Sequence, residues 1–314
     1  MSLRVRGNLM LLVTAFIWGS CFVAQRAGMD YLGPFTFTAV RFLLGGTVLI
    51  PIMFLFERKK TPLERRPADT LPDAPAKPES LVKKERKMLW IGGLVCGFVL
   101  FFAASVQQVG LQYTTAGKAG FITSLYIILV PVLGLFLRKK VRHILWFCIF
   151  LGTVGLYFLC ITESFSIGRG DFIMLFAALG YGIHILSIDY FAPKVDSIKL
   201  SAAQFYACSL VCFIPAFIFE TPRMADILLA WFPLLYAGII SCGIAYTFQT
   251  IAQKYTDPTV TSLILSLESV FAVLTGFVIL HEVLSLRELF GCALMLFAII
   301  LSQLPARQPK PPLE

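Results

Sequence analysis

Ten long apolar stretches run through this chain of 314 residues, and they constrain its fold more than any other feature. A helix needs about 20 predominantly apolar residues to cross a bilayer. Only 14% of the residues are charged, against about 25% in an average soluble domain. We therefore predict an all-α polytopic membrane protein with ten transmembrane helices. The predicted spans are residues 7–27, 33–56, 88–112, 117–137, 142–161, 171–191, 199–219, 227–252, 259–281 and 287–304.

The distribution of Lys and Arg predicts the orientation of these spans. If the N-terminus is cytoplasmic, 21 of the 27 Lys and Arg residues fall on the cytoplasmic side, 4 on the other side and 2 within spans. Because cytoplasmic loops carry an excess of Lys and Arg, we expect both termini in the cytoplasm and a multi-pass protein of the inner (plasma) membrane. The net charge of +9 then reflects orientation, and we expect no nucleic-acid partner.

The longest segment that is not apolar is residues 57–87, between the second and third spans. It holds ten Lys and Arg residues and six Asp and Glu residues. Such a composition buries too little apolar surface to fold, so we predict a disordered cytoplasmic linker. Residues 305–314 are expected to form a cytoplasmic tail.

The eight cysteines all lie in apolar stretches, and no CxxC pair occurs. Buried thiols behave as small hydrophobic side chains. We therefore expect no metal site and no bound cofactor. A proton gradient is the candidate source of energy.

The two halves of the sequence match one another at offsets of 163 and 142 residues. The 21 extra residues of the first half fall where the 57–87 linker lies. We interpret residues 1–161 and 162–304 as two repeats of five spans, the second inverted because five is odd. Inverted repeats with substrate bound between them are typical of secondary transporters. The matches are Trp18-Gly19 with Tyr181-Gly182 at the first offset, and Gln107 with Gln249, Ser124-Leu125 with Ser266-Leu267 and Gly134 with Gly276 at the second.

Two segments resemble the EamA domain of the drug/metabolite transporter (DMT) superfamily. Residues 15–26 and the Val-Arg-Phe-Leu-Leu run at 40–44 resemble the first half of one copy, and residues 266–291 resemble the end of a second. Ser269 stands where that domain commonly has a proline. The resemblance implies a transporter of small solutes and is poorly specific for the substrate. The residues that carry the second match are Leu267-Glu268, Gly276, His281-Glu282 and Gly291.

Two ionisable residues lie well inside predicted spans, where a charge costs about 2.5–3.5 kcal/mol on insertion scales. Arg41 has two interpretations: it contacts an anion or forms a gate, or it is a structural residue that holds helices together. The resemblance favours a structural or gating role. Glu268 is the one carboxylate near the centre of a span. Because removal from water favours the neutral acid, Glu268 suits a proton-coupling site, and a hydrogen-bonded structural Glu is the equal alternative.

Aromatic and neutral hydrogen-bonding side chains within the spans predict a substrate pocket. Side chains three and four residues apart share one face of a helix, and polar faces turned to lipid would lack partners. Such a pocket suits amino acids or other small zwitterionic or aromatic metabolites, and it does not suit a sugar phosphate. His184 is a packing residue in the competing interpretation. The predicted substrate-binding residues are Trp18, Gln108, Tyr126, Tyr181, His184, Tyr246 and Gln249.

We therefore predict a secondary active transporter that exports small metabolites, amino acids foremost, by alternating access between the repeats. Its expected partners are a small-molecule substrate and membrane lipid; a monomer is compatible with the sequence. A facilitative channel or uniporter and a multidrug exporter are the alternatives. An intramembrane enzyme is disfavoured, since Ser285 replaces the second His in the nearest match to a zinc-binding HExxH motif.

Overall fold

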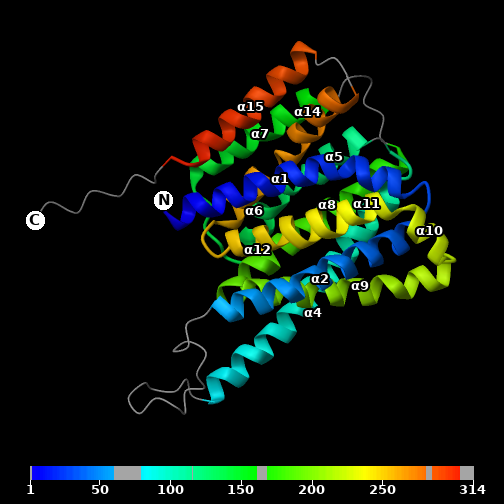
Figure 1. Cartoon of the computed structure of the whole chain (residues 1–314). Coiled ribbons are helices and arrows are strands. Elements are labelled where there is room, and N and C mark those ends of the chain that lie inside the picture. The colour runs from blue at the N-terminus through cyan, green and yellow to red at the C-terminus, as the bar shows by residue number, and fades with distance from the viewer. Residues whose placement is uncertain (1, 60–78, 115, 161–167, 281–284, 305–314) are drawn as a thin grey trace, which may run out of the picture.

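The computed structural model describes residues 2–59, 79–114, 116–160, 168–280 and 285–304, and these residues form helices and no strand (Figure 1). The all-α prediction is confirmed for this part of the chain. The helices are α1 (Leu3–Gly28), α2 (Pro34–Lys59), α4 (Glu79–Gly110), α5 (Ala116–Ser124), α6 (Tyr126–Phe136), α7 (His143–Cys160), α8 (Arg169–Phe191), the 3₁₀ turn η2 (Ala192–Lys194), α9 (Ser197–Phe219), α10 (Met224–Leu229), α11 (Trp231–Leu235), the π-helix η3 (Tyr236–Tyr246), α12 (Thr247–Ala252), α13 (Pro258–Leu265), α14 (Glu268–Leu280) and α15 (Leu286–Ser302).

Several helices begin where the sequence supplies a capping side chain. Ser2 accepts a hydrogen bond from the Val5 N–H at the start of α1. Asp196 caps α9, and Asp257 caps α13 directly before Pro258. Each cap satisfies N–H groups that have no partner within the helix, so the polar residues between apolar stretches set where the helices start.

Eight helical segments among the described residues are long and apolar enough to cross a membrane, and His143–Leu159 is a shorter apolar helix. Large apolar side chains cover their outer surfaces; Phe136, Phe217 and Phe219 are 82%, 69% and 76% exposed. Many Gln, Ser and Thr side chains are instead buried. An apolar exterior around a polar interior is the arrangement that a lipid environment favours.

Two of the predicted spans are broken in the middle. The fourth divides at Leu125, between α5 and α6, and the ninth divides at Ser266-Leu267, between α13 and α14. Leu125 and Leu267 are 142 residues apart. The ninth span is interrupted although no proline follows Glu268. At the interruption the Leu267 and Ser269 N–H groups donate to carbonyl groups three residues earlier in the chain, and not four as in a regular α-helix. The Ser266 hydroxyl donates to the Leu263 carbonyl, which also competes with regular helix bonding.

The eighth predicted span is irregular as well, since η3 occupies its middle. Here α2 approaches η3 closely. A Cβ atom on Gly45 would lie 2.6 Å from the Cys242 Cβ, and one on Gly238 would lie 2.7 Å from the Leu44 Cβ. Only glycine lets the two backbones come this near.

The prediction of a disordered linker over 57–87 is wrong at both ends. Helix α2 continues to Lys59 and α4 begins at Glu79. Helix formation is cooperative, so long apolar helices extend into flanking Glu, Lys and Arg residues, which are good helix formers. The middle of the predicted linker, 60–78, and the predicted tail, 305–314, lie outside the described residues.

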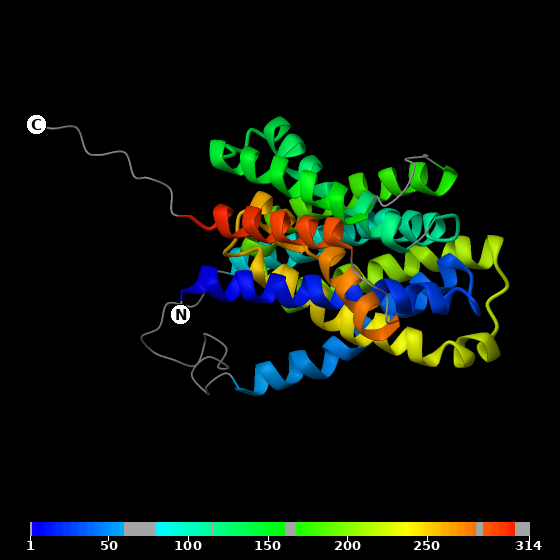
Figure 2. The same cartoon turned by 90° about the horizontal axis from the view of Figure 1, so that it is seen from above.

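The helices lie side by side, and most packing joins the first half of the chain to the second (Figures 1 and 2). Helix α4 packs on α8 and α9, α2 on α9 and η3, and α7 on α15, whereas α1 contacts α12, α13, α14 and η3. The start of α1 lies beside the end of α15, where the Asn8 amide donates to Gln303 Oε1 at 2.6 Å. The first and the last described helices therefore bring the two ends of the chain to the same end of the helical bundle.

Candidate functional site

A cavity lies in the interior of the bundle and is lined by side chains from both halves of the chain. Its volume is about 30 Å³, which is room for roughly two water molecules. Helices α1, α2, α4, α5 and α6 contribute residues from the first half, and α8, η3 and α14 from the second. The lining residues are Trp18, Phe22, Gln25, Arg41, Gln107, Thr123, Tyr126, Tyr181, Ser241, Tyr246 and Glu268.

Glu268 is the first residue of α14 and is 3% exposed. The Tyr126 hydroxyl donates to its Oε1 at 3.1 Å, and the Ser124 hydroxyl lies 3.3 Å from the same atom. Ser124 also shares a hydrogen bond of 2.8 Å with Ser269. Because Tyr126 is itself the first residue of α6, the two helix breaks meet at this carboxylate. A carboxylate is also favoured by the dipole at a helix N-terminus.

Arg41 enters the cavity from α2 and is 3% exposed. Its Nη1 donates to Gln25 Oε1 at 2.9 Å. The guanidinium carbon lies 5.1 Å from the centre of the Phe42 ring and 5.8 Å from that of Phe37. Within the described part of the chain, Nε and Nη2 make no hydrogen bond, and no carboxylate there forms an ion pair with Arg41.

Aromatic rings and amides complete the cavity walls. The Trp18 and Tyr246 rings pack with centroids 4.5 Å apart. The Tyr181 hydroxyl donates to Gln107 Oε1 at 2.9 Å, and the amide nitrogen of Gln107 donates to Thr123 Oγ1 at 3.3 Å. These contacts fix the aromatic faces and leave a site with one buried cation, one buried carboxyl group and neutral polar groups.

Six of the nine site residues predicted from the sequence line this cavity, and three do not. The Gln108 amide turns away and lies 3.3 Å from the Gln25 carbonyl. His184 is fully buried, 3.0 Å from Gln204 Oε1, with its ring against the edge of the Tyr246 ring. Gln249 is buried on α12 and outside the cavity lining. The residues that do line it are Trp18, Arg41, Tyr126, Tyr181, Tyr246 and Glu268.

Gln25 and Gln107 line the cavity although neither was among the predicted site residues, whereas the adjacent Gln108, which was predicted, does not line it. Trp18, Phe22 and Gln25 are spaced four and three residues apart, so one face of α1 carries all three. That spacing could have identified Gln25. Gln107 rather than Gln108 faces the cavity because neighbouring residues on a helix point about 100° apart.

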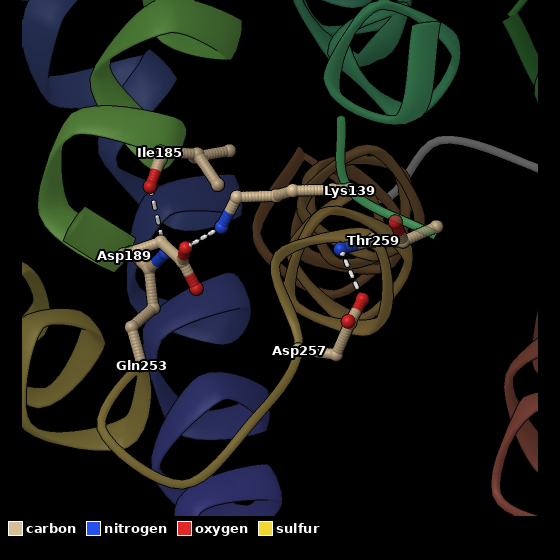
Figure 3. A network of polar contacts seen from close by, with 6 residues as sticks. All are labelled: Lys139, Ile185, Asp189, Gln253, Asp257 and Thr259. Atoms are coloured by element: carbon tan, nitrogen blue, oxygen red, sulfur yellow. Dashed lines mark hydrogen bonds and ion pairs between the residues drawn. The ribbon is translucent and has the colours of Figure 1, made fainter. Parts of the chain in front are cut away.

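A second group of polar residues joins the halves away from the cavity (Figure 3). Lys139, in the loop after α6, forms an ion pair with Asp189 of α8. Nearby, the Gln253 amide nitrogen donates to the Ile185 carbonyl at 2.9 Å, and Asp257 caps α13. Lys139 is the only described residue in an ion pair with Asp189, so this contact ties the α6–α7 loop to α8.

The model of the EamA-like transporter family matches residues 5–161 and again residues 168–304. The chain belongs to the EamA-like transporter family. The resemblance seen in the sequence is thereby confirmed, and this EamA-like protein is a multi-pass membrane transporter. Because its family and named relatives are transporters, it is not an enzyme.

Relatives of this EamA-like transporter extend over nearly its whole length. A protein of Archaeoglobus fulgidus named as an uncharacterized transporter is 30% identical, over 96% of this chain and 87% of its own. A chloroplastic WAT1-related protein of Arabidopsis thaliana is 25% identical, over 92% of this chain and 67% of that protein. A protein of known crystal structure, 18% identical, superposes with a TM-score of 0.72 over 95% of this chain and 96% of that one. At this low sequence identity, the similarity to the solved structure is evidence for the fold alone.

Proposed function

We propose that this EamA-like transporter is a secondary active transporter that exports small metabolites, amino acids or similar polar or aromatic compounds, by alternating access. One observation carries the proposal: the interior cavity brings Arg41 and Glu268 together with aromatic walls, and both halves of the chain contribute to it. Charged groups buried in a membrane protein mark substrate or ion pathways.

The proposed architecture is ten transmembrane helices in two inverted repeats, residues 1–161 and 162–304. The protein is proposed to lie in the inner (plasma) membrane with both termini in the cytoplasm. The two helix breaks support it, because they are separated by the 142-residue offset of the sequence repeat. The contact between Asn8 and Gln303 supports termini on one side. Broken helices that surround a central site are a recurring feature of inverted-repeat transporters.

The size of the cavity supports a mechanism in which the helices move. A cavity volume of about 30 Å³ accommodates water and no amino acid. A solute therefore enters only after the two halves separate on one side, and it leaves only after they separate on the other. Such gating motion, rather than a standing pore, is what alternating access requires.

Glu268 is proposed as the coupling residue and Arg41 as a gating residue. Glu268 is buried at the meeting point of the two helix breaks, so a change in its charge alters contacts of both α6 and α14. A proton taken up on one side and released on the other would link transport to a pH gradient. Arg41 lies on α2, directly across from η3.

The experiment that tests the function is uptake by proteoliposomes containing the purified full chain, with a panel of radiolabelled amino acids, bases and cationic drugs. We expect saturable uptake of at least one amino acid that responds to an imposed pH gradient. Uptake of drugs alone would identify a multidrug exporter. Saturable uptake without response to any gradient would identify a uniporter, and no uptake of any compound would contradict the proposal.

A further inference from the structure

The Arg41 side chain has hydrogen-bonding capacity that the protein leaves unused. Nη1 is occupied by Gln25, whereas Nε and Nη2 have no partner among the residues that the structure describes, although Arg41 is only 3% exposed. A buried charge is costly unless it is paired and hydrogen-bonded. A guanidinium with free donors at the wall of a cavity is therefore suited to receive an anion there.

The groups around Arg41 leave this edge of the guanidinium available. The Phe42 and Phe37 rings face its carbon and favour a cation; they do not replace hydrogen bonds in the guanidinium plane. Glu268 lines the same cavity, but Tyr126 and Ser124 hold its Oε1, and it forms no ion pair with Arg41.

The two free nitrogens are the pair that binds a carboxylate best. Nε and Nη2 lie on one side of the guanidinium and donate parallel N–H bonds, which match the two oxygens of a carboxylate. The hydrogen bond from Nη1 to Gln25 Oε1 fixes the orientation of the guanidinium group and so of these two N–H donors. A phosphate dianion would need a second cation, and Arg41 is the one Lys or Arg among the lining residues.

We propose that Arg41 binds the carboxylate of the transported compound through Nε and Nη2, a role that rests on the transport function proposed above. Arg41 is then a specificity-determining residue: it selects solutes that carry one carboxylate. Once the two halves have separated on one side, the aromatic walls formed by Trp18, Tyr181 and Tyr246 take the apolar part of such a solute.

The test compares compounds that differ only at the carboxyl group, L-phenylalanine with L-phenylalaninamide and benzoate with benzamide. Binding is measured as the rise in thermal unfolding temperature of the purified full chain, and transport as uptake into proteoliposomes. We expect each acid to stabilise the wild-type protein more than its amide does. In Arg41→Gln this preference should fall by roughly 30-fold or more in affinity, and in Arg41→Lys, which keeps the charge and loses the fork, by less.

Arg26→Gln is the matched control, because Arg26 bonds the Leu111 carbonyl at 2.6 Å and does not line the cavity. It should keep the wild-type preference for acids. If Arg41→Gln does not fold, the acid and amide pairs on the wild-type protein and on Arg41→Lys still decide. Equal binding of acid and amide by the wild-type protein overturns the inference. Acid-selective binding without any uptake would leave Arg41 as a carboxylate site and remove the transport function instead.

Discussion

The Tyr126 hydroxyl donates a hydrogen bond of 3.1 Å to Glu268 Oε1, and the two residues are the first residues of two helices, α6 and α14. They are also 142 residues apart, the offset at which the halves of the sequence match. The contact therefore connects corresponding positions of the two halves at the wall of the cavity. A change at either residue acts on both helix breaks.

Replacing the carboxyl group of Glu268 with an amide tests whether this residue couples transport to a pH gradient. Glu268→Gln keeps the shape of the side chain and cannot gain or lose a proton, so we expect uptake driven by a pH gradient to be abolished and counterflow of substrate to remain. Tyr126→Phe is a comparison variant and not a neutral control: it removes one hydrogen bond to Glu268, worth about 1 kcal/mol of stability, but keeps the carboxyl group, so its uptake should still respond to the pH gradient. Uptake by Glu268→Gln that still follows the pH gradient would remove Glu268 from coupling.

Gly19 lets α1 reach the backbone of α14 beside Glu268. A Cβ atom at Gly19 would collide with the Glu268 carbonyl oxygen and lie 2.8 Å from the Ala272 nitrogen. We expect Gly19→Ala to lower the free energy of unfolding by about 1–3 kcal/mol and to reduce transport. Gly182→Ala, at the matching position of the second half, is the control, since its Cβ would meet Leu129 Cβ at 3.4 Å, an ordinary contact. Equal thermal stability of the two variants would show that the approach of α1 to α14 does not require glycine at position 19.

The ion pair of Lys139 and Asp189 is partly exposed, with side chains 35% and 15% accessible. Solvent weakens such a pair, so we expect Lys139→Gln or Asp189→Asn to lower stability by about 1 kcal/mol or less. The double exchange of Lys139→Asp with Asp189→Lys should restore part of it. Lys140→Gln, which changes an exposed neighbouring lysine, should have no effect. Thermal unfolding in detergent measures all four, and a double exchange less stable than both single variants would argue against a direct pair.

The proposed orientation has its own test. Epitope tags inserted at residue 70 and after residue 304 should both be inaccessible to antibody in intact spheroplasts, because both positions are expected in the cytoplasm. A tag at residue 164 should be accessible, since this position is expected on the opposite side of the membrane. Exposure of the first two tags and protection of the third would reverse the orientation.

The sequence predicted helical spans well because twenty apolar residues have few alternatives to a helix in lipid. The breaks at Leu125 and Ser266-Leu267 were not predicted, since they depend on local hydrogen bonds such as that of Ser266 with Leu263. Apolar composition does not encode such bonds. The helical residues 79–87 were missed for a different reason: they are charged, but they continue a helix that the apolar span has already nucleated.

The candidate site was predicted in its charged and most of its aromatic members, and less well in its amides. Arg41 and Glu268 could be predicted because an ionisable residue within a membrane span is energetically costly and is therefore usually functional. Gln108 and Gln249 did not stand out from their neighbours by composition. Whether a glutamine faces the cavity depends on the rotation of its helix, and a helix with polar residues on several faces leaves that rotation undetermined.

We propose that solutes pass through this EamA-like transporter by alternating access to the cavity lined by Tyr126 and Glu268. Counterflow distinguishes this mechanism from a channel: proteoliposomes are loaded with an unlabelled substrate, and entry of the labelled compound is followed without any ion gradient. We predict that internal substrate accelerates entry, that entry saturates with external concentration, and that acceleration persists in Glu268→Gln. Entry that rises linearly with concentration and is indifferent to internal substrate would show a channel and contradict the claim.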